Sequence, residues 1–292
     1  MDSRVGRTLR DLGATLEMIQ FEHTVFALPF ALMGAVLAEG GIPPFRTLIW
    51  VLAAMVGARS AAMTFNRLAD QPYDLQNPRT ASRPLVTGRL SRRFAWIFLA
   101  YSSGLFILAA AMLNRLAFLL SFPVLALILG YSYAKRFSWG SHFFLGASLA
   151  CSPLGAWIAV RGRFEWPPIV LALAVLCWTA GFDIIYACQD TEFDRRVGLH
   201  SIPRRWGIGA ALHVSRVLHA LMLLVLLAVG RSLALGGLFY AGVAGTGLLL
   251  AYEHSLVRVD DFSRVNRAFF TVNGCVSLFL FVMTLADRLF LA

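Results

Sequence analysis

The chain has 292 residues, of which 58% are hydrophobic and only 14% are charged, and its mean hydropathy is +0.69. Soluble domains average about 45–50% apolar and about 25% charged residues, so this composition argues against a soluble globular enzyme and against a disordered chain. The net charge of +10 would suit a nucleic-acid partner, but the apolar runs favour a membrane, with arginines placed by topology, and we expect no nucleic acid to bind.

In chain order, nine apolar segments are each long enough to cross a bilayer core of about 30 Å as a helix. They span approximately residues 18–39, 45–66, 94–113, 115–134, 142–161, 165–187, 208–229, 232–251 and 268–290. Because these runs are continuously apolar rather than alternating, they predict helices and not the strands of a barrel. We therefore predict an all-α, multi-pass transmembrane helical bundle that forms one integral-membrane domain over residues 1–292.

Basic residues are distributed unevenly over the connections between these segments. Eighteen lie at the N-terminus or in the connections that follow the second, fourth, sixth and eighth segments, whereas six lie on the other side. The positive-inside rule then predicts that the N-terminus and the long connections face the cytoplasm and that the C-terminus lies outside. We expect the first segment to be retained, because Glu22 and His23 make it a poor signal peptide.

Acidic residues number only 16, and five aspartates gather at the ends of the second and sixth segments. The first group is Asn66, Asp70 and Asp74, and the second is Asp183, Tyr186, Asp190 and Asp194. Each group is spaced to share one helix face. Since both segments end on the same side of the membrane, we expect the groups to meet in one active site, with loops at about 66–93 and 186–207.

Carboxylates a few ångströms apart repel one another, so such clusters become favourable when a divalent cation lies between them. Mg²⁺ is commonly held by one or two carboxylates together with substrate phosphates. Arginine suits phosphate, and the nearby basic residues are Arg79, Arg83, Arg136 and the only lysine, Lys135. The pattern predicts a site for a Mg²⁺–diphosphate, although a solvated acidic face paired with arginines remains the alternative.

Arg59 lies seven residues before Asn66, about two helical turns deeper in the membrane. A charged side chain at that depth costs several kcal/mol unless it is paired or hydrated, so we expect Arg59 to face the interior of the bundle. There it binds either an anionic group of a substrate or a structural partner such as Asp183, and the sequence leaves both explanations open.

The two aspartate groups carry a resemblance to a known family. The run Asn66-x3-Asp70-x3-Asp74, followed by Arg79-Thr80-Ala81-Ser82-Arg83-Pro84-Leu85, resembles the first aspartate-rich motif of the UbiA superfamily of intramembrane aromatic prenyltransferases. The run from Tyr186 through Asp190 and Asp194 is similar to the second motif, and the stretch 182–190 looks like the quinone-pathway branch. Arg67 stands where the first motif commonly has an aspartate, so the first group has one carboxylate fewer.

The resemblance implies an enzyme like 4-hydroxybenzoate polyprenyltransferase. It would transfer a polyprenyl group from polyprenyl diphosphate to a ring carbon of 4-hydroxybenzoate or a dihydroxynaphthoate, in ubiquinone or menaquinone biosynthesis. Mg²⁺ would be held by Asp70, Asp74, Asp190 and Asp194. Asn66, Arg79, Arg83, Arg136 and Tyr186 would bind substrate, and Asp183, Arg59 and Lys135 would be catalytic. The resemblance also implies a bacterial plasma-membrane protein with its active site facing the cytoplasm.

Two other functions compete with this one. A membrane transporter would also carry ionisable residues within its spans, but it predicts charges near the midplane, whereas these acids concentrate at one membrane face. A membrane phosphotransferase would also need clustered aspartates and Mg²⁺, but its pattern of Asp-Gly-x2-Ala-Arg leading into further aspartates is absent from the chain.

Overall fold

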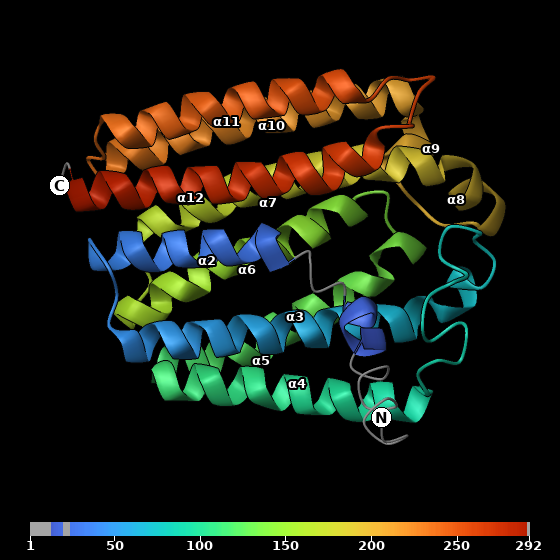
Figure 1. Cartoon of the computed structure of the whole chain (residues 1–292), viewed down its shortest axis with the longest axis horizontal. Helices are drawn as coiled ribbons and strands as arrows, with labels where there is room; N and C mark the ends of the chain where they lie inside the picture. Colours follow the sequence, from blue (N-terminus) through green and yellow to red (C-terminus); the bar gives the residue numbers. More distant parts are fainter. Residues whose placement is uncertain (1–12, 20–23, 291–292) are drawn as a thin grey trace, which may run out of the picture.

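The computed structural model describes residues 13–19 and 24–290, and in these residues the chain is helical, without a strand. Long helices lie side by side along the longest axis of the molecule (Figure 1). They are α2 (Thr24–Glu39), α3 (Phe45–Asp74), α4 (Arg92–Leu113), α5 (Arg115–Gly130), α6 (Ser141–Arg161), α7 (Trp166–Ala187), α10 (Ile208–Ser232), α11 (Gly237–Leu256) and α12 (Asn273–Phe290). The predicted all-α membrane bundle is thus confirmed.

Each of the nine predicted segments overlaps one of these long helices. Seven of the described helical stretches are long and apolar enough to cross a membrane. The two remaining positions hold α2, whose apolar part Phe26–Glu39 is shorter, and α11, which is not among the seven. Length and hydropathy therefore support seven of the nine predicted spans. Arg4, Arg7 and Arg10, which contribute to the predicted orientation, lie outside the described residues.

The predicted end of the second segment, at residue 66, is wrong, because α3 continues for two more turns to Asp74. Pro72 lies inside this extension. Proline has no backbone N–H, so the helix loses one i→i−4 hydrogen bond at this position. The backbone N–H of Leu75 still reaches the Gln71 carbonyl oxygen at 3.2 Å, so the helical path continues past the proline. The extension keeps Asn66, Asp70 and Asp74 on helical backbone, as their spacing requires.

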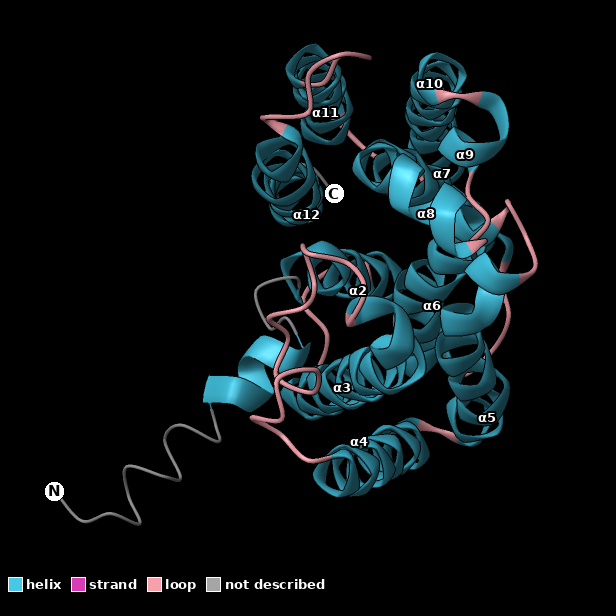
Figure 2. Ribbon diagram, turned by 90° about the vertical axis from the view of Figure 1, so that its right-hand side faces the viewer, coloured by secondary structure: helices cyan, strands magenta, loops and turns pink. Residues whose placement is uncertain are grey.

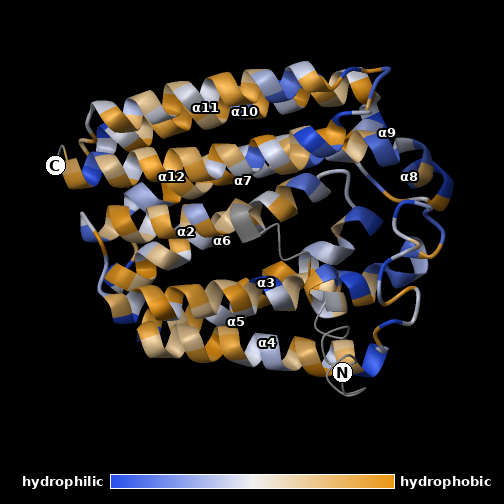
Figure 3. Ribbon diagram, in the orientation of Figure 1, coloured by the Kyte–Doolittle hydropathy of each residue, from blue (hydrophilic) through white to orange (hydrophobic). Residues whose placement is uncertain are grey.

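The short elements gather at one end of the bundle. They are the turn-rich segment 75–91, the 3₁₀-helices η2 (Tyr131–Arg136) and η3 (Cys188–Asp190), α8 (Thr191–Val197) and α9 (Ile202–Trp206). Figure 3 shows hydrophilic residues concentrated at this α8 end, whereas the long helices are mostly hydrophobic. A π-helix, η4 (Arg267–Val272), leads into α12 near the same end.

Close helix packing surrounds the centre of the bundle, which Figure 2 views from the α8 end. Helix α7 packs against α6 and α10, and α2 packs against α6 and α12. Small residues permit this approach: a Cβ added to Gly146 of α6 would lie 2.7 Å from the Leu176 carbonyl oxygen of α7. Trp178 and Phe182 of α7 are buried in the largest core cluster, so α7 is held firmly where it reaches the α8 end.

Candidate active site

A cavity of about 260 Å³, here called the charged cavity, lies among the elements of the α8 end. All of the predicted site residues line it: Arg59, Asn66, Asp70, Asp74, Arg79, Arg83, Lys135, Arg136, Asp183, Tyr186, Asp190 and Asp194. They come from α3, the segment 75–91, η2, α7, η3 and α8. The fold therefore brings together residues that are more than 120 positions apart in the sequence, from Arg59 to Asp194.

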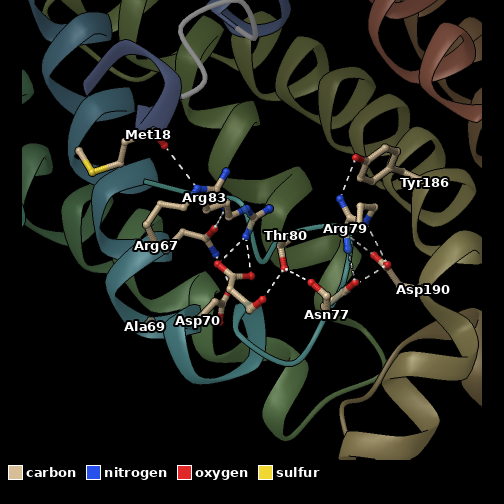
Figure 4. Close-up of polar contacts among 12 residues, drawn as sticks. Met18, Arg67, Ala69, Asp70, Asn77, Arg79, Thr80, Arg83, Tyr186 and Asp190 are labelled. Atoms are coloured by element: carbon tan, nitrogen blue, oxygen red, sulfur yellow. Dashed lines mark hydrogen bonds and ion pairs between the residues drawn. The ribbon is translucent and has the colours of Figure 1, made fainter. Parts of the chain in front are cut away.

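The segment 75–91 connects the two aspartate-bearing helices. The Arg83 guanidinium contacts both carboxylate oxygens of Asp74 at 2.6 Å. Arg79 forms a two-point contact with Asp190 of η3, from Nε to Oδ1 at 3.2 Å and from a terminal nitrogen to Oδ2 at 2.7 Å (Figure 4). Its other terminal nitrogen donates to the Tyr186 hydroxyl at 3.0 Å. Two aspartates of the site are thus neutralised by arginines from one segment.

The charge of Arg79 is strongly favoured by these neighbours. Burial opposes the charged guanidinium, but the Asp190 carboxylate and the Tyr186 hydroxyl outweigh that effect and raise the pKa of Arg79. Arg79 therefore remains a fixed positive charge beside the cavity at every accessible pH.

Asp70 is held by its own helix and by η2. The Asn66 amide nitrogen donates to Asp70 Oδ2 at 2.8 Å, and the Arg136 guanidinium lies 3.7 Å from Oδ1. Arg136 also donates to the Ala69 carbonyl oxygen at 2.7 Å and lies over the Tyr133 ring at 4.6 Å. Lys135 next to it interacts electrostatically with Asp194, Asp183, Asp190 and Asp70, which centres its charge in the site.

Arg67, which departs from the usual motif, is only 4% exposed and turns toward the helix over residues 13–19. Its Nε donates to the Met18 carbonyl oxygen at 3.3 Å (Figure 4). A terminal nitrogen donates to Asn66 Oδ1 at 3.1 Å. Arg67 thereby fixes the Asn66 amide with its nitrogen toward Asp70. In place of a carboxylate, this position supplies a bridge between the 13–19 helix and the first motif.

The remaining two aspartates are held by α9 and α6. Ser201 donates to Asp194 Oδ2 at 2.9 Å, and Asp194 is 2% exposed. Asp183 Oδ2 lies 2.6 Å from Nδ1 of His142 in the first turn of α6. Asp183 therefore pairs with His142.

The aspartates do not form a ready-made metal cage. In the described part of the chain, no three His, Cys, Asp or Glu side chains lie close enough together to hold a metal ion. Mg²⁺ commonly takes one or two carboxylates together with substrate phosphates and several waters. Separate aspartates around one cavity thus fit an ion that arrives with a diphosphate.

An apolar cavity of about 250 Å³ adjoins the charged cavity deeper in the bundle, among α3, α4, α5 and α6. The residues common to both cavities are Arg59, Met63, Tyr131, Leu145 and Leu149. Arg59 is therefore at the boundary between a polar and an apolar cavity. This agrees with the prediction that it faces the interior of the bundle about two helical turns below Asn66. On another side of the charged cavity, Phe26, Phe182 and Phe269 form an aromatic wall, with ring centroids 5.3–5.8 Å apart.

Sequence reasoning missed several contributors to the site. Asn77 accepts a hydrogen bond from the Arg79 backbone N–H at 3.0 Å and so shapes the turn, for which the Asn-Pro pair at 77–78 is a signal. His142 had no such signal, because a single histidine at the start of an apolar run is ordinarily structural. Phe26 and Phe269 belong to the first and last segments and reach the site only through the fold.

Comparisons with known proteins agree with this geometry. The sequence profile of the UbiA prenyltransferase family matches residues 27–280. A 4-hydroxybenzoate octaprenyltransferase from Alcanivorax borkumensis is 35% identical over 228 residues, which are 77% of each chain. The apo structure of a UbiA homolog from Aeropyrum pernix K1 is 36% identical, with a TM-score of 0.83 over 91% of this chain and 98% of that chain. A UbiA homolog from Archaeoglobus fulgidus, bound to DMAPP and Mg²⁺, shares the fold at 20% identity, with a TM-score of 0.74 over 94% and 99% of the chains.

Proposed function

The chain belongs to the UbiA prenyltransferase family and is a membrane prenyltransferase, and from that premise we propose which reaction it catalyses. It transfers a polyprenyl group from polyprenyl diphosphate to a ring carbon of a hydroxylated aromatic acid, 4-hydroxybenzoate or a dihydroxynaphthoate, in quinone biosynthesis. The observation that carries the proposal is the single cavity in which both aspartate groups meet the basic residues. Apolar helices and bacterial relatives support an inner-membrane protein, and the distribution of arginines supports a site facing the cytoplasm.

The diphosphate of the donor binds in the charged cavity. Mg²⁺, held by Asp70, Asp74, Asp190 and Asp194, would supply the positive charge that makes the diphosphate a good leaving group. Arg79 and Arg83 exchange their aspartates for phosphate oxygens, and Lys135 and Arg136 add charge from η2. Asn66 and Tyr186 orient the phosphates by hydrogen bonds. Positive groups fixed in place before the reaction stabilise the charge that develops as the diphosphate leaves.

The first isoprene unit of the donor lies against the aromatic wall of Phe26, Phe182 and Phe269. The faces of aromatic rings attract cations, so this wall stabilises the allylic carbon as positive charge develops on it. Tyr186 extends the wall toward the diphosphate, because its ring contacts that of Phe269 in a tilted arrangement, with centroids 4.2 Å apart. The wall also keeps water away from the reactive carbon.

The acceptor binds at the boundary between the two cavities, with its carboxylate on Arg59 and its hydroxyl toward Asp183 in the charged cavity. The Arg59 guanidinium supplies the charge that a carboxylate requires there. Met63, Leu145 and Leu149, which line both cavities, give the aromatic ring an apolar surface to pack against. One cation beside an apolar surface supports an aromatic acid as the acceptor.

The reaction breaks the C1–O bond of the donor, and the electron pair of that bond leaves with the diphosphate. Asp183 accepts the proton of the acceptor's hydroxyl, and the ring carbon beside that hydroxyl forms the new bond to C1. The substituted ring carbon then loses its hydrogen as a proton to solvent, and the oxygen regains a proton from Asp183. The sum is a prenylated aromatic acid, diphosphate and one proton.

The test uses membranes that contain the protein, Mg²⁺, a short prenyl diphosphate and a panel of hydroxylated aromatic acids, with products identified by mass spectrometry. We expect prenylated 4-hydroxybenzoate or dihydroxynaphthoate, and loss of product with Asp70→Ala, with Asp190→Ala and after chelation of Mg²⁺. Asp260→Ala, at an exposed position outside the site, is the matched control and keeps full activity. The proposal fails if no acceptor is prenylated, or if the two site variants remain as active as the control.

A further inference from the structure

His142 of α6 is a hydrogen-bond partner of the active-site residue Asp183. Its side chain is 0% exposed, and it lies in the first turn of the helix. Nδ1 lies 2.6 Å from Asp183 Oδ2, and Nε2 lies 3.3 Å from the backbone nitrogen of Ile202, the first residue of α9. Both ring nitrogens are therefore engaged, and neither contacts solvent.

The contact with Ile202 determines which nitrogen carries the hydrogen. A backbone N–H can only donate, so Nε2 must accept and is unprotonated in this arrangement. The neutral ring then carries its hydrogen on Nδ1 and donates it to Asp183. This hydrogen bond occupies Oδ2 of the carboxylate and fixes its rotamer, and Asp183 remains part of the cavity lining with a side chain 19% exposed.

The N-terminus of α9 thus connects to two active-site aspartates through neighbouring residues. Ser201 caps α9 by accepting from the Arg204 backbone N–H at 3.4 Å, and its hydroxyl also donates to Asp194. Ile202 reaches Asp183 through His142. A displacement of α9 would therefore move Asp183 and Asp194 together. In the proposed function, Asp183 contacts the acceptor and Asp194 holds the Mg²⁺ of the diphosphate, so α9 couples the two substrate positions.

We propose that His142 is a positioning residue that holds Asp183 in the orientation in which it accepts the acceptor's proton. This inference rests on the proposed function, because it assumes that Asp183 is the proton acceptor. The step breaks the O–H bond of the acceptor's hydroxyl, leaves the electron pair on that oxygen and places the proton on the free oxygen of Asp183. His142 exchanges no proton in this step, and its Nδ1–H stays on the opposite oxygen of the carboxylate.

The test compares two substitutions at this position. Glutamine keeps one donor and one acceptor at the end of its side chain, so His142→Gln retains both hydrogen bonds without an imidazole. His142→Phe fills the space but removes both. We expect His142→Phe to lower kcat about 10- to 100-fold with the donor KM unchanged within about 2-fold, and His142→Gln to recover most of the wild-type kcat. His213→Phe, at an exposed position of α10, is the control and leaves both parameters unchanged.

A double-mutant cycle separates positioning from a general role in folding. If His142 acts through Asp183, adding His142→Phe to Asp183→Asn lowers kcat no further. Additive losses, a fully active His142→Phe, a fully active Asp183→Asn, or a His142→Gln variant as slow as His142→Phe would each overturn the inference. Thermal unfolding in detergent checks each variant, and His142→Ala replaces the phenylalanine variant if that does not fold. A wild-type protein without any prenyl transfer would instead refute the proposed function.

Discussion

Arg79 and Arg83 lie four residues apart, yet they hold aspartates on different elements, Asp190 of η3 and Asp74 of α3. Their side chains are 34% and 20% exposed, so water screens these pairs less than it screens pairs on the open surface. A partly buried aspartate without a cationic partner raises the free energy of the protein. Each arginine can therefore leave its aspartate only when another cation takes its place. A diphosphate that arrives with Mg²⁺ satisfies both sides of this exchange.

The first prediction at the residue scale concerns the shape of Arg79. A lysine keeps the charge but cannot contact both Asp190 oxygens and Tyr186 at once, so Arg79→Lys should lower kcat/KM for the donor about 10- to 100-fold. That loss corresponds to about 1.4–2.7 kcal/mol of transition-state stabilisation. Initial rates measured against prenyl diphosphate concentration check it. Arg89→Lys is the matched control, because the Arg89–Glu17 pair is 51% and 47% exposed and should contribute little.

The second residue-scale prediction concerns Arg59 and the acceptor's carboxylate. Arg59→Met keeps an unbranched side chain and removes its charge, so the enzyme should lose its preference for 4-hydroxybenzoate over 4-hydroxybenzamide. We expect the ratio of kcat/KM for these two acceptors to fall at least about tenfold, as for the loss of a hydrogen-bonded charge. The donor KM should stay within about 2-fold of the wild-type value. An unchanged acceptor ratio would show that Arg59 has a structural role alone.

At the scale of elements, the sequence predicted the positions of the helices well and their ends less well. Continuous apolar runs determine where a helix crosses the bilayer, and each of the nine predicted segments overlaps a long helix. Hydropathy falls at Asn66, but the backbone stays helical to Asp74, because the polar side chains there are solvated or paired. Spacing on one helix face, which does not depend on hydropathy, grouped Asn66, Asp70 and Asp74 correctly, because α3 carries all three. For the second group it was wrong, because the helix ends at Ala187 and the aspartates at 183, 190 and 194 lie on α7, η3 and α8.

The parts of the site that could not be predicted come from contacts between distant elements. His142 and Asp183 are 41 residues apart, and no spacing rule connects them. Met18 reaches Arg67 across 49 residues. The cavity wall of Phe26, Phe182 and Phe269 depends on how α2, α7 and η4 pack. Residue type and helical period identify which groups carry the chemistry, whereas packing alone decides what orients them.

Close packing of α3 against α4 leads to a prediction for one glycine. A Cβ added at Gly57 would lie 2.7 Å from the Phe106 backbone nitrogen and 2.9 Å from the Ser102 carbonyl oxygen. Backbone atoms cannot move aside cheaply, so Gly57→Ala should lower the free energy of unfolding by about 1–3 kcal/mol. Gly104→Ala, where no atom lies within 4 Å of the added Cβ, should be neutral or slightly stabilising. Thermal unfolding of the two variants in detergent measures the difference.

The whole molecule has one polar end, and this polarity bears on how the protein is oriented in the membrane. The charged cavity, α8, α9 and the arginine-rich segment 75–91 all lie at the α8 end, whereas the short connection 162–165 lies at the other (Figure 1). With eighteen basic residues assigned to one side and six to the other, the positive-inside rule predicts a cytoplasmic α8 end. Diphosphate donors that cannot cross a bilayer would then reach the cavity directly.

Cysteine labelling in cells tests this orientation. The four native cysteines, Cys151, Cys177, Cys188 and Cys275, are free and can be replaced by alanine to give an unreactive background. Arg163→Cys lies in the connection from α6 to α7, and Asp260→Cys lies after α11 at the α8 end, and both positions are exposed. A membrane-impermeant maleimide should label Arg163→Cys in intact spheroplasts and Asp260→Cys only after permeabilisation. The reverse pattern would place the cavity outside the cytoplasm, and the same arginine distribution would then need an explanation other than topology.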